Sequence, residues 1–162
     1  MEPKIADFSL AKLLNRGGSN INVSRIQRTR GYLAPEWVSS LPITAKVDVY
    51  SFGVVLLELL NGARISDMEK NEDEELEMVL GRIVRMLKEN LKFDGTEQSW
   101  ISQFIDARLK GELNYMQART MMKLAVSCLE EDRSRRPTME NVVQKLVSVD
   151  EVTSTIGGGG AV

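Results

Sequence analysis

Any chemistry in this chain has to rest on carboxylates, hydroxyls, lysines and arginines, because none of its 162 residues is a histidine. That absence excludes Ser-His-Asp and Cys-His catalysis and the common histidine-based zinc sites. Cys128 is the single cysteine, so the chain forms no internal disulfide, which suits a reducing compartment. Because Cys128 falls on the apolar face of a predicted helix, a small buried hydrophobe is favoured over a reactive thiol.

Asp7 is the acid whose surroundings best suit a ligand. Ile5 and Ala6 belong to a short apolar segment that is compatible with a buried strand, which would place Asp7 at the end of that strand. Residues 15–31 then lose all periodicity and are rich in glycine, asparagine, serine and arginine. A loop of that length within a compact domain is usually functional or disordered.

The element that must position these groups is the apolar stretch of residues 46–62, whose apolar side chains point in every direction around a helical wheel. Such a helix belongs inside a protein, with other elements packed about it. A membrane span would need about 20 apolar residues, and Asp48 and Glu58 interrupt this run. A buried strand is also compatible with the periodicity, but the length and the Asn61-Gly62 stop favour a helix.

Four further helical segments surround it in the prediction, at residues 76–91, 100–109, 114–129 and 138–149. The first is amphipathic, with a capping-box pattern at residues 71–74. Thr44, Asn114 and Thr138 are the expected N-caps of the central helix and of the last two helices. The apolar face of the last helix is expected to comprise Met139, Val142, Val143, Leu146 and Val149. Residues 151–162 contain four consecutive glycines at 157–160, which predicts a flexible tail.

The distribution of charged residues does not indicate a particular class of binding partner. The formal net charge is −2 with both signs mixed along the chain, which gives no indication of a nucleic-acid or anionic-membrane surface. The sequence shows no signal peptide, lipidation motif or transmembrane segment.

Three ordered blocks resemble the C-terminal lobe of a eukaryotic-type protein kinase. They are Asp7-Phe8-Ser9, Ala34-Pro35-Glu36, and Asp48 to Gly53 together with Arg136. Two of the sequence motifs are similar to those of plant receptor-like serine/threonine kinases: Gly31-Tyr32-Leu33-Ala34-Pro35-Glu36-Trp37 and Arg136-Pro137-Thr138-Met139. Leu41 to Lys46 and Leu129 to Arg133 resemble their S-domain (G-type lectin) branch. The resemblance covers roughly residues 4–150.

The resemblance implies a role for several loop residues. Asp7 would bind magnesium on the ATP phosphates, although an acid that caps a loop is the plainer alternative. Thr29 would face the catalytic aspartate, a feature of serine/threonine specificity. Tyr32, Leu33, Ala34 and Pro35, here called the peptide shelf, would form the floor under the substrate residue that follows the phosphorylated one.

Ser19, Ser24 and Thr29 are candidate phosphosites, because a phosphate beside the neighbouring arginines could order the loop. A solvated Ser/Arg loop without modification is the alternative.

Three charged residues would have structural roles. The resemblance implies a buried ion pair between Glu36 and Arg136, since a guanidinium can hold a carboxylate at two points. Two separate surface charges are the alternative. Asp48 lies in the apolar helix and would need hydrogen-bond donors, because an unpaired buried carboxylate is costly. In the family those donors are backbone amides of the catalytic loop.

Several parts required for phosphoryl transfer are not found in this sequence. They are the Gly-rich loop over the phosphates, the strand lysine paired with a helix glutamate, and the catalytic loop with its base. No catalytic residue and no nucleotide-binding residue is therefore assigned. Two positions also depart from the family pattern, Ser9 in place of the third-position glycine and Arg28 before Thr29. Ser9 narrows the backbone freedom that switching between loop states needs. Arg28 would cost roughly 1–2 kcal/mol if the backbone there needs a positive φ.

Together these observations predict a mainly α fold, a partial kinase-like C-terminal lobe with a short β segment at its N-terminus. Residues 1–150 would form a partial kinase domain, comprising an activation segment at 4–36 and a helical subdomain at 37–150, followed by the tail. The complete protein would use ATP and Mg to phosphorylate serine or threonine, whereas this chain alone is expected to be inactive and to bind neither tightly.

A non-catalytic, kinase-like interaction module or truncated decoy is the alternative function. Expected partners are a protein substrate or another kinase, and the chain could self-associate through an exposed apolar helix face. The isolated chain is expected in the cytoplasm, or on the cytosolic side of the plasma membrane if it is part of a receptor.

Overall fold

The computed structural model describes residues 30–37, 39, 42–68, 75–92 and 99–156, and this part of the chain is helical. Its α-helices are α2 (Lys46–Asn61), α3 (Leu76–Lys92), α4 (Ser99–Phe104), α5 (Tyr115–Cys128) and α6 (Met139–Ile156). Short 3-10 turns precede or connect them: η2 (Arg30–Tyr32) and η3 (Pro35–Trp37) before α2, then η4 (Ile65–Met68), η5 (Ala107–Leu109) and η6 (Arg133–Arg135) between helices. The predicted mainly α class is therefore confirmed, while the predicted opening strand lies outside the described residues.

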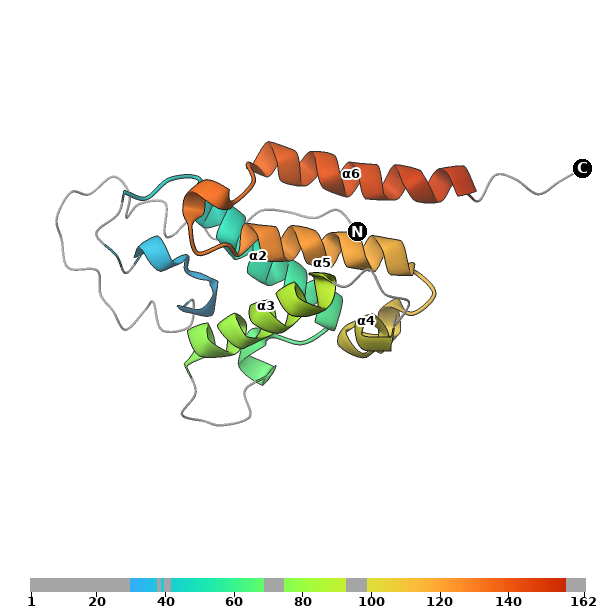
Figure 1. Ribbon diagram of the computed structural model, residues 1–162, viewed down its shortest axis with the longest axis horizontal. Coiled ribbons are helices and arrows are strands. Elements are labelled where there is room, and N and C mark those ends of the chain that lie inside the picture. The colour runs from blue at the N-terminus through green and yellow to red at the C-terminus, as the bar shows by residue number, and fades with distance from the viewer. Residues whose placement is uncertain (1–29, 38, 40–41, 69–74, 93–98, 157–162) are drawn as a thin grey trace, which may run out of the picture.

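Helix α2 forms the middle of the core, as its all-round apolar sequence predicts. Eight of its residues are buried, among them Val54 and Leu57 with no exposed surface. It packs most extensively against α5, which lies in front of it in Figure 1. Its burial is nevertheless incomplete, because Val55 is 40% exposed and Leu59 is 65% exposed.

The two ends of α2 differ in how well the sequence predicts them. The N-cap lies one residue after the expected one: Ala45 is the N-cap and gives no side-chain bond, while the hydroxyl of Thr44 accepts a 3.4 Å bond from the Lys46 amide. Asn61-Gly62 ends the helix as predicted. Gly62 has a φ of 78°, a left-handed conformation in which its amide donates to the Glu58 carbonyl at 2.7 Å.

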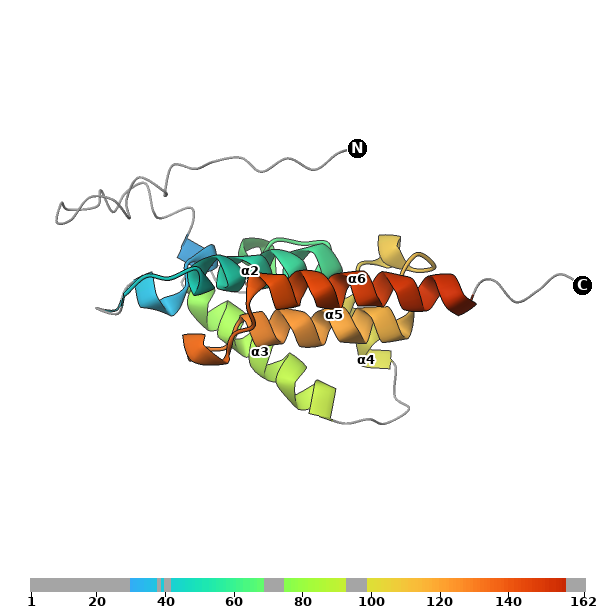
Figure 2. The same cartoon turned by 90° about the horizontal axis from the view of Figure 1, so that it is seen from above.

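Helix α5 covers one side of α2, and α3 and α4 in turn pack against α5. Figure 2 shows α3 running obliquely to α2 and α5. The predicted amphipathic helix is confirmed as α3, which buries Val79, Leu80 and Leu87. The capping box of α5 is also present: the Asn114 side chain accepts from the Gln117 amide, and the Gln117 side chain accepts from the Asn114 amide, both at 2.9 Å. The predicted capping box at residues 71–74 lies outside the described residues.

Helix α6 departs from the prediction in two respects. Its expected core face is too wide, since only Val142 is fully buried while Met139 and Val143 are 39% and 53% exposed. One helix, α5, supplies most of the packing for α6, so only a narrow stripe is covered (Figure 2). The helix also continues to Ile156, so residues 151–156 are helical rather than part of a flexible tail. Thr138 caps it as predicted, accepting from the Asn141 amide at 3.2 Å.

No helix in the described ranges is long and apolar enough to cross a membrane.

Candidate functional site

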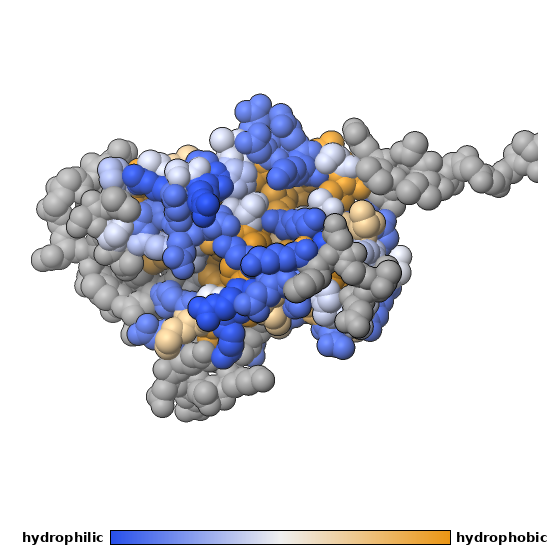
Figure 3. All heavy atoms as spheres, in the orientation of Figure 1, coloured by the Kyte–Doolittle hydropathy of each residue, from blue (hydrophilic) through white to orange (hydrophobic). Residues whose placement is uncertain are grey.

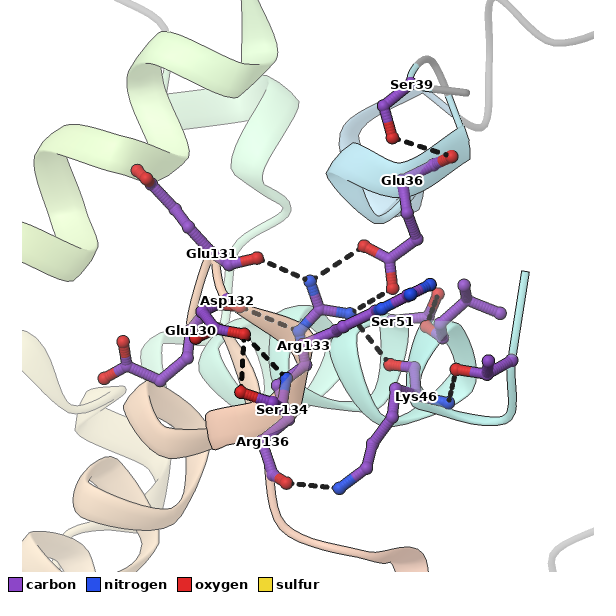
Figure 4. Close-up of polar contacts among 12 residues, drawn as sticks. Glu36, Ser39, Lys46, Ser51, Glu130, Glu131, Asp132, Arg133, Ser134 and Arg136 are labelled. Carbon is purple, nitrogen blue, oxygen red and sulfur yellow. Dashed lines mark hydrogen bonds and ion pairs between the residues drawn. The ribbon is translucent and has the colours of Figure 1, made fainter. Parts of the chain in front are cut away.

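The guanidinium of Arg136 lies at the centre of a polar cluster that joins η3, the start of α2 and the segment after α5 (Figure 4). Its Nη1 and Nη2 donate to the two carboxylate oxygens of Glu36 at 2.6 and 2.9 Å. Nη1 also donates to the Lys46 carbonyl at 3.1 Å, Nη2 to the Glu131 carbonyl at 3.3 Å, and Nε to the Glu130 carbonyl at 2.7 Å. All five N–H groups of an arginine side chain are thereby used.

The Glu36–Arg136 pair is buried, in addition to being fully hydrogen-bonded on the arginine side. The side chains of Arg136 and Glu36 are 0% and 2% exposed, so the alternative of two separate surface charges is wrong. Burial alone would raise the pKa of Glu36, but the Arg136 hydrogen bonds, a backbone hydrogen bond and the arginine's charge together lower that pKa. Glu36 is therefore ionised at neutral pH, and the two-point contact fixes its orientation.

An aromatic ring completes the surroundings of Arg136. The guanidinium carbon lies 4.9 Å from the centre of the Tyr50 ring, within the range of a cation–π contact. Burial raises the pKa of Tyr50 to about 12, so this tyrosine stays neutral beside the arginine. Tyr50 comes from α2, Glu36 from η3 and Arg136 from the segment after η6, so three separated parts of the chain meet here.

Local sequence explains why Arg136 reaches this position. The Asp132 carboxylate caps η6 by accepting from the Ser134 amide at 2.9 Å. The chain then runs extended at Arg136, as expected for a residue that precedes proline. The ammonium group of Lys46 bonds the Arg136 carbonyl and donates to the Pro137 carbonyl at 3.0 Å, so the start of α2 holds the same segment.

A second polar cluster holds Tyr32, the first residue of the peptide shelf. The Tyr32 hydroxyl donates to both carboxylate oxygens of Glu58, at 2.8 and 2.9 Å. Glu58 Oε1 also accepts from the Ile65 amide at 2.8 Å, and the Ser51 hydroxyl donates to the Tyr32 carbonyl at 2.7 Å. Burial, the hydrogen bond to Glu58 and its negative charge raise the pKa of Tyr32.

The structure brings together part of the predicted site. Ala34 is buried at 1% exposure, Pro35 is exposed, and both lie between the two clusters. Asp48, in contrast, is exposed rather than buried on the first turn of α2. Its side chain faces away from the core and is open to hydration. The donors that the resemblance implies for it, backbone amides of a catalytic loop, are not identified among the described residues, so that pairing stays a prediction. Four predicted residues lie outside the described ranges: Asp7, Ser19, Ser24 and Thr29.

The described residues offer no fit for a metal ion. They contain no group of three or more histidine, cysteine, aspartate or glutamate side chains arranged to hold one. Asp7, the one predicted ligand, lies outside them, so a magnesium site at Asp7 stays a prediction.

Cys128, in turn, is fully buried, as predicted, and burial raises the pKa of its thiol to about 11.

Glu58 and Lys46 are site residues that the sequence does not predict. Glu58 interrupts an otherwise apolar helix, and that interruption is a signal for a polar partner. The partner itself, Tyr32, is 26 positions away in sequence, and no local pattern identifies it. Lys46 likewise bonds carbonyls 90 and 91 positions away.

Comparison with known proteins places this geometry in context. Residues 1–147 match the family described as Protein kinase domain. A Zea mays protein that carries the name receptor protein kinase ZmPK1 is 63% identical over 93% of this chain. The Arabidopsis thaliana G-type lectin S-receptor-like serine/threonine-protein kinase At1g34300 is 36% identical over 94% of it. The chain spans only 18% and 17% of the lengths of these two relatives.

A solved structure shares the fold. The pseudokinase domain of BIR2 superposes with a TM-score of 0.57 over 81% of this chain and 34% of that domain, at 24% sequence identity. At that identity the likeness concerns the fold alone. It supports the kinase-like arrangement of the helices described above.

Proposed function

This chain belongs to the protein kinase family, and we propose that it is the activation segment and helical subdomain of a receptor-like serine/threonine kinase, inactive when isolated. The observation that carries the proposal is the Glu36–Arg136 pair, 2.6 Å apart and buried. It anchors the end of the peptide shelf to the helical core, where a substrate peptide would be received. The chain's relatives are plant G-type lectin S-receptor-like kinases.

In the complete protein this region would present a peptide, and other regions would supply the chemistry. Transfer of the γ-phosphoryl group of ATP needs a phosphate cradle, a metal and a base placed together. ATP and Mg would supply the phosphoryl group and neutralise its charge. The residues of this chain would orient the acceptor peptide, with Thr29 beside the acceptor hydroxyl and the peptide shelf under the next residue.

Inactivity of the isolated chain follows from what its own sequence lacks. It has no strand lysine motif, no Gly-rich phosphate loop and no catalytic-loop aspartate. Asp7 and the peptide shelf cannot by themselves place a catalytic base beside the acceptor hydroxyl and the γ-phosphoryl group of ATP.

The experiment incubates the purified 162-residue chain with radiolabelled ATP, Mg and a serine- and threonine-containing peptide mixture. We expect incorporation at the level of the blank. A kinase graft, in which residues 1–147 replace the matching segment of the ZmPK1 kinase domain, is the companion sample and should transfer phosphate. Transfer by the isolated chain, or none by the kinase graft while ZmPK1 itself is active, would overturn the proposal.

A further inference from the structure

We propose that the exposed side of α3 is a surface on which a second copy of this chain docks, in an antiparallel contact with two-fold symmetry. The surface consists of five exposed residues, here called the α3 face: Glu75, Met78, Gly81, Arg82 and Arg85. Spacings of three, four and seven residues place these positions on one side of a helix. The opposite side of α3 packs on the core through Val79, Leu80 and Leu87.

Glu75 belongs to the α3 face although it precedes the first residue of the helix. Its carbonyl accepts from the amides of Met78 and Val79 at 2.9 and 3.2 Å, so it continues the helical path by one residue. Met78 is 55% exposed, which is unusual for a large apolar side chain next to the fully buried Val79.

Gly81 indicates that the backbone of another chain approaches α3. It lies within the helix, where glycine is the poorest helix former after proline. A Cβ placed on Gly81 would meet nothing within 4 Å, so no contact within the described part of the chain requires a residue without a side chain here. An exposed glycine lets a second backbone come close. A docked helix from another copy gives this residue the neighbour that its own chain does not supply.

The charges of the α3 face complement one another when two copies run antiparallel. With the two-fold axis beside residue 80, Glu75 of one copy lies opposite Arg85 of the other, and symmetry repeats this ion pair. Met78 lies opposite Arg82, whose aliphatic stem packs on the methionine. Gly81 lies next to the axis, where the two helices come closest.

Other arrangements of two α3 helices fit the same residues less well. A parallel contact places Arg82 and Arg85 opposite their own copies, so like charges meet. An antiparallel contact nearer the C-terminus pairs Arg82 with Glu89, but its axis falls between Arg85 and Met86 and gives Gly81 no role. The position of Gly81 therefore favours the register in which Glu75 faces Arg85.

The contact is small and depends on charge. Four layers of side chains between two helices cover less than the roughly 1,200 Å² at which stable specific interfaces begin, so the dimer is weak and reversible. Its ion pairs remain near solvent and are screened by salt. Association through the α3 face should therefore weaken as sodium chloride is added, whereas association through exposed apolar side chains should not.

The test measures the dimer dissociation constant of the full 162-residue chain by sedimentation equilibrium. Every sample carries Leu59→Glu, which suppresses association through the exposed apolar side chain of α2. Glu75→Arg and Arg85→Glu each create two contacts between like charges per dimer, and each should weaken the dimer about 3- to 30-fold. The double variant exchanges the two charges and should restore the parent value. Because the single variants change the net charge in opposite directions, net charge cannot explain a loss in both.

Two further variants separate docking from folding. Gly81→Gln favours the helix but adds a side chain beside the axis, so the urea midpoint of the dilute, monomeric chain should rise while the dimer weakens at least about tenfold. Glu89→Arg is the matched control, because it reverses an exposed charge of α3 outside the paired positions. It should leave the dissociation constant unchanged.

Three outcomes would overturn the proposal. They are a chain that stays monomeric up to millimolar concentration, a double charge exchange no better than the single variants, and a loss in Glu89→Arg as large as in Glu75→Arg. The last would assign the contact to other positions on α3. None of these outcomes depends on phosphoryl transfer, so they are distinct from a failure of the proposed function.

Discussion

Gly53 and Cys128 bring α2 and α5 into backbone contact. A Cβ placed on Gly53 would lie 2.8 Å from the Cβ of Cys128 and 3.1 Å from the Ala125 carbonyl oxygen. The absence of a side chain at Gly53 therefore sets the separation of the two helices that form the core.

Gly53→Ala should destabilise the chain by about 1–3 kcal/mol, because the added methyl group meets backbone and Cβ atoms that cannot rotate away. The matched control is Gly81→Ala on α3, where a Cβ would meet nothing within 4 Å. The control should gain about 0.5–1 kcal/mol from helix propensity. Urea unfolding followed by circular dichroism measures both, and equal effects of the two substitutions would contradict this account of the packing.

Removing Arg136 should be among the most damaging single changes. Arg136→Ala leaves the Glu36 carboxylate buried without its partner, and breaking a buried pair in this way costs about 3–5 kcal/mol. Arg135→Ala, at the exposed neighbouring arginine, should change the free energy of unfolding by less than about 0.5 kcal/mol. A loss at Arg136 no larger than at Arg135 would show that the buried pair contributes nothing to stability.

Stability should fall in acid partly through Glu36. The folded state lowers the pKa of Glu36 below its ordinary value of 4.5, so the folded state binds its proton less readily than the unfolded state. The stabilisation is therefore complete above that ordinary pKa and is lost as pH falls through the lower folded-state value. Hydrogen bonds from Arg108 and from Ser134 also lower the pKa values of Asp106 and Asp132.

Comparison with Glu36→Gln isolates the contribution of Glu36. The difference in unfolding free energy between the two proteins should be constant from pH 7 to 5 and should shrink below about pH 4.5. A difference that grows on acidification would contradict the assigned direction of the pKa shift.

The central helix shows how far the sequence predicts this fold. An all-round apolar run ending in Asn61-Gly62 is enough to identify a buried helix and its last residue, because burial and a left-handed glycine leave local signatures. Asn114 with Gln117 identifies a helix start for the same reason. The width of the buried face of α6 has no such signature, since Val143 is apolar and still 53% exposed. It depends on which elements pack against the helix.

The residues of the candidate site likewise differ in how well the sequence predicts them. The resemblance to kinases identifies Glu36 and Arg136 although 100 positions separate them, because it supplies the pairing that spacing cannot. Asp48 is exposed on the first turn of α2, because a buried helix need not bury every residue. Its pairing with catalytic-loop amides stays a prediction. The Tyr32–Glu58 bond is not predictable from local sequence, because Glu58 indicates that a partner exists but not where along the chain it lies.

Exposed apolar side chains should make the isolated chain associate. Leu59 on α2 and Val147 on α6 are 65% and 52% exposed, and Figure 3 shows apolar surface between hydrophilic side chains on one face. Light scattering after size exclusion should show a mass that rises with concentration. Leu59→Glu should reduce it, whereas Met116→Glu, at an equally exposed residue of α5, should not. A monodisperse monomer with a sharp cooperative melt would contradict this expectation.

The most direct test of the central claim is phosphoamino acid analysis of a peptide substrate treated with the kinase graft and with the isolated chain. The account predicts phosphoserine and phosphothreonine from the kinase graft, no phosphotyrosine, and no labelled product from the isolated chain. Labelled product from the isolated chain, or phosphotyrosine as the main product of the kinase graft, would contradict it.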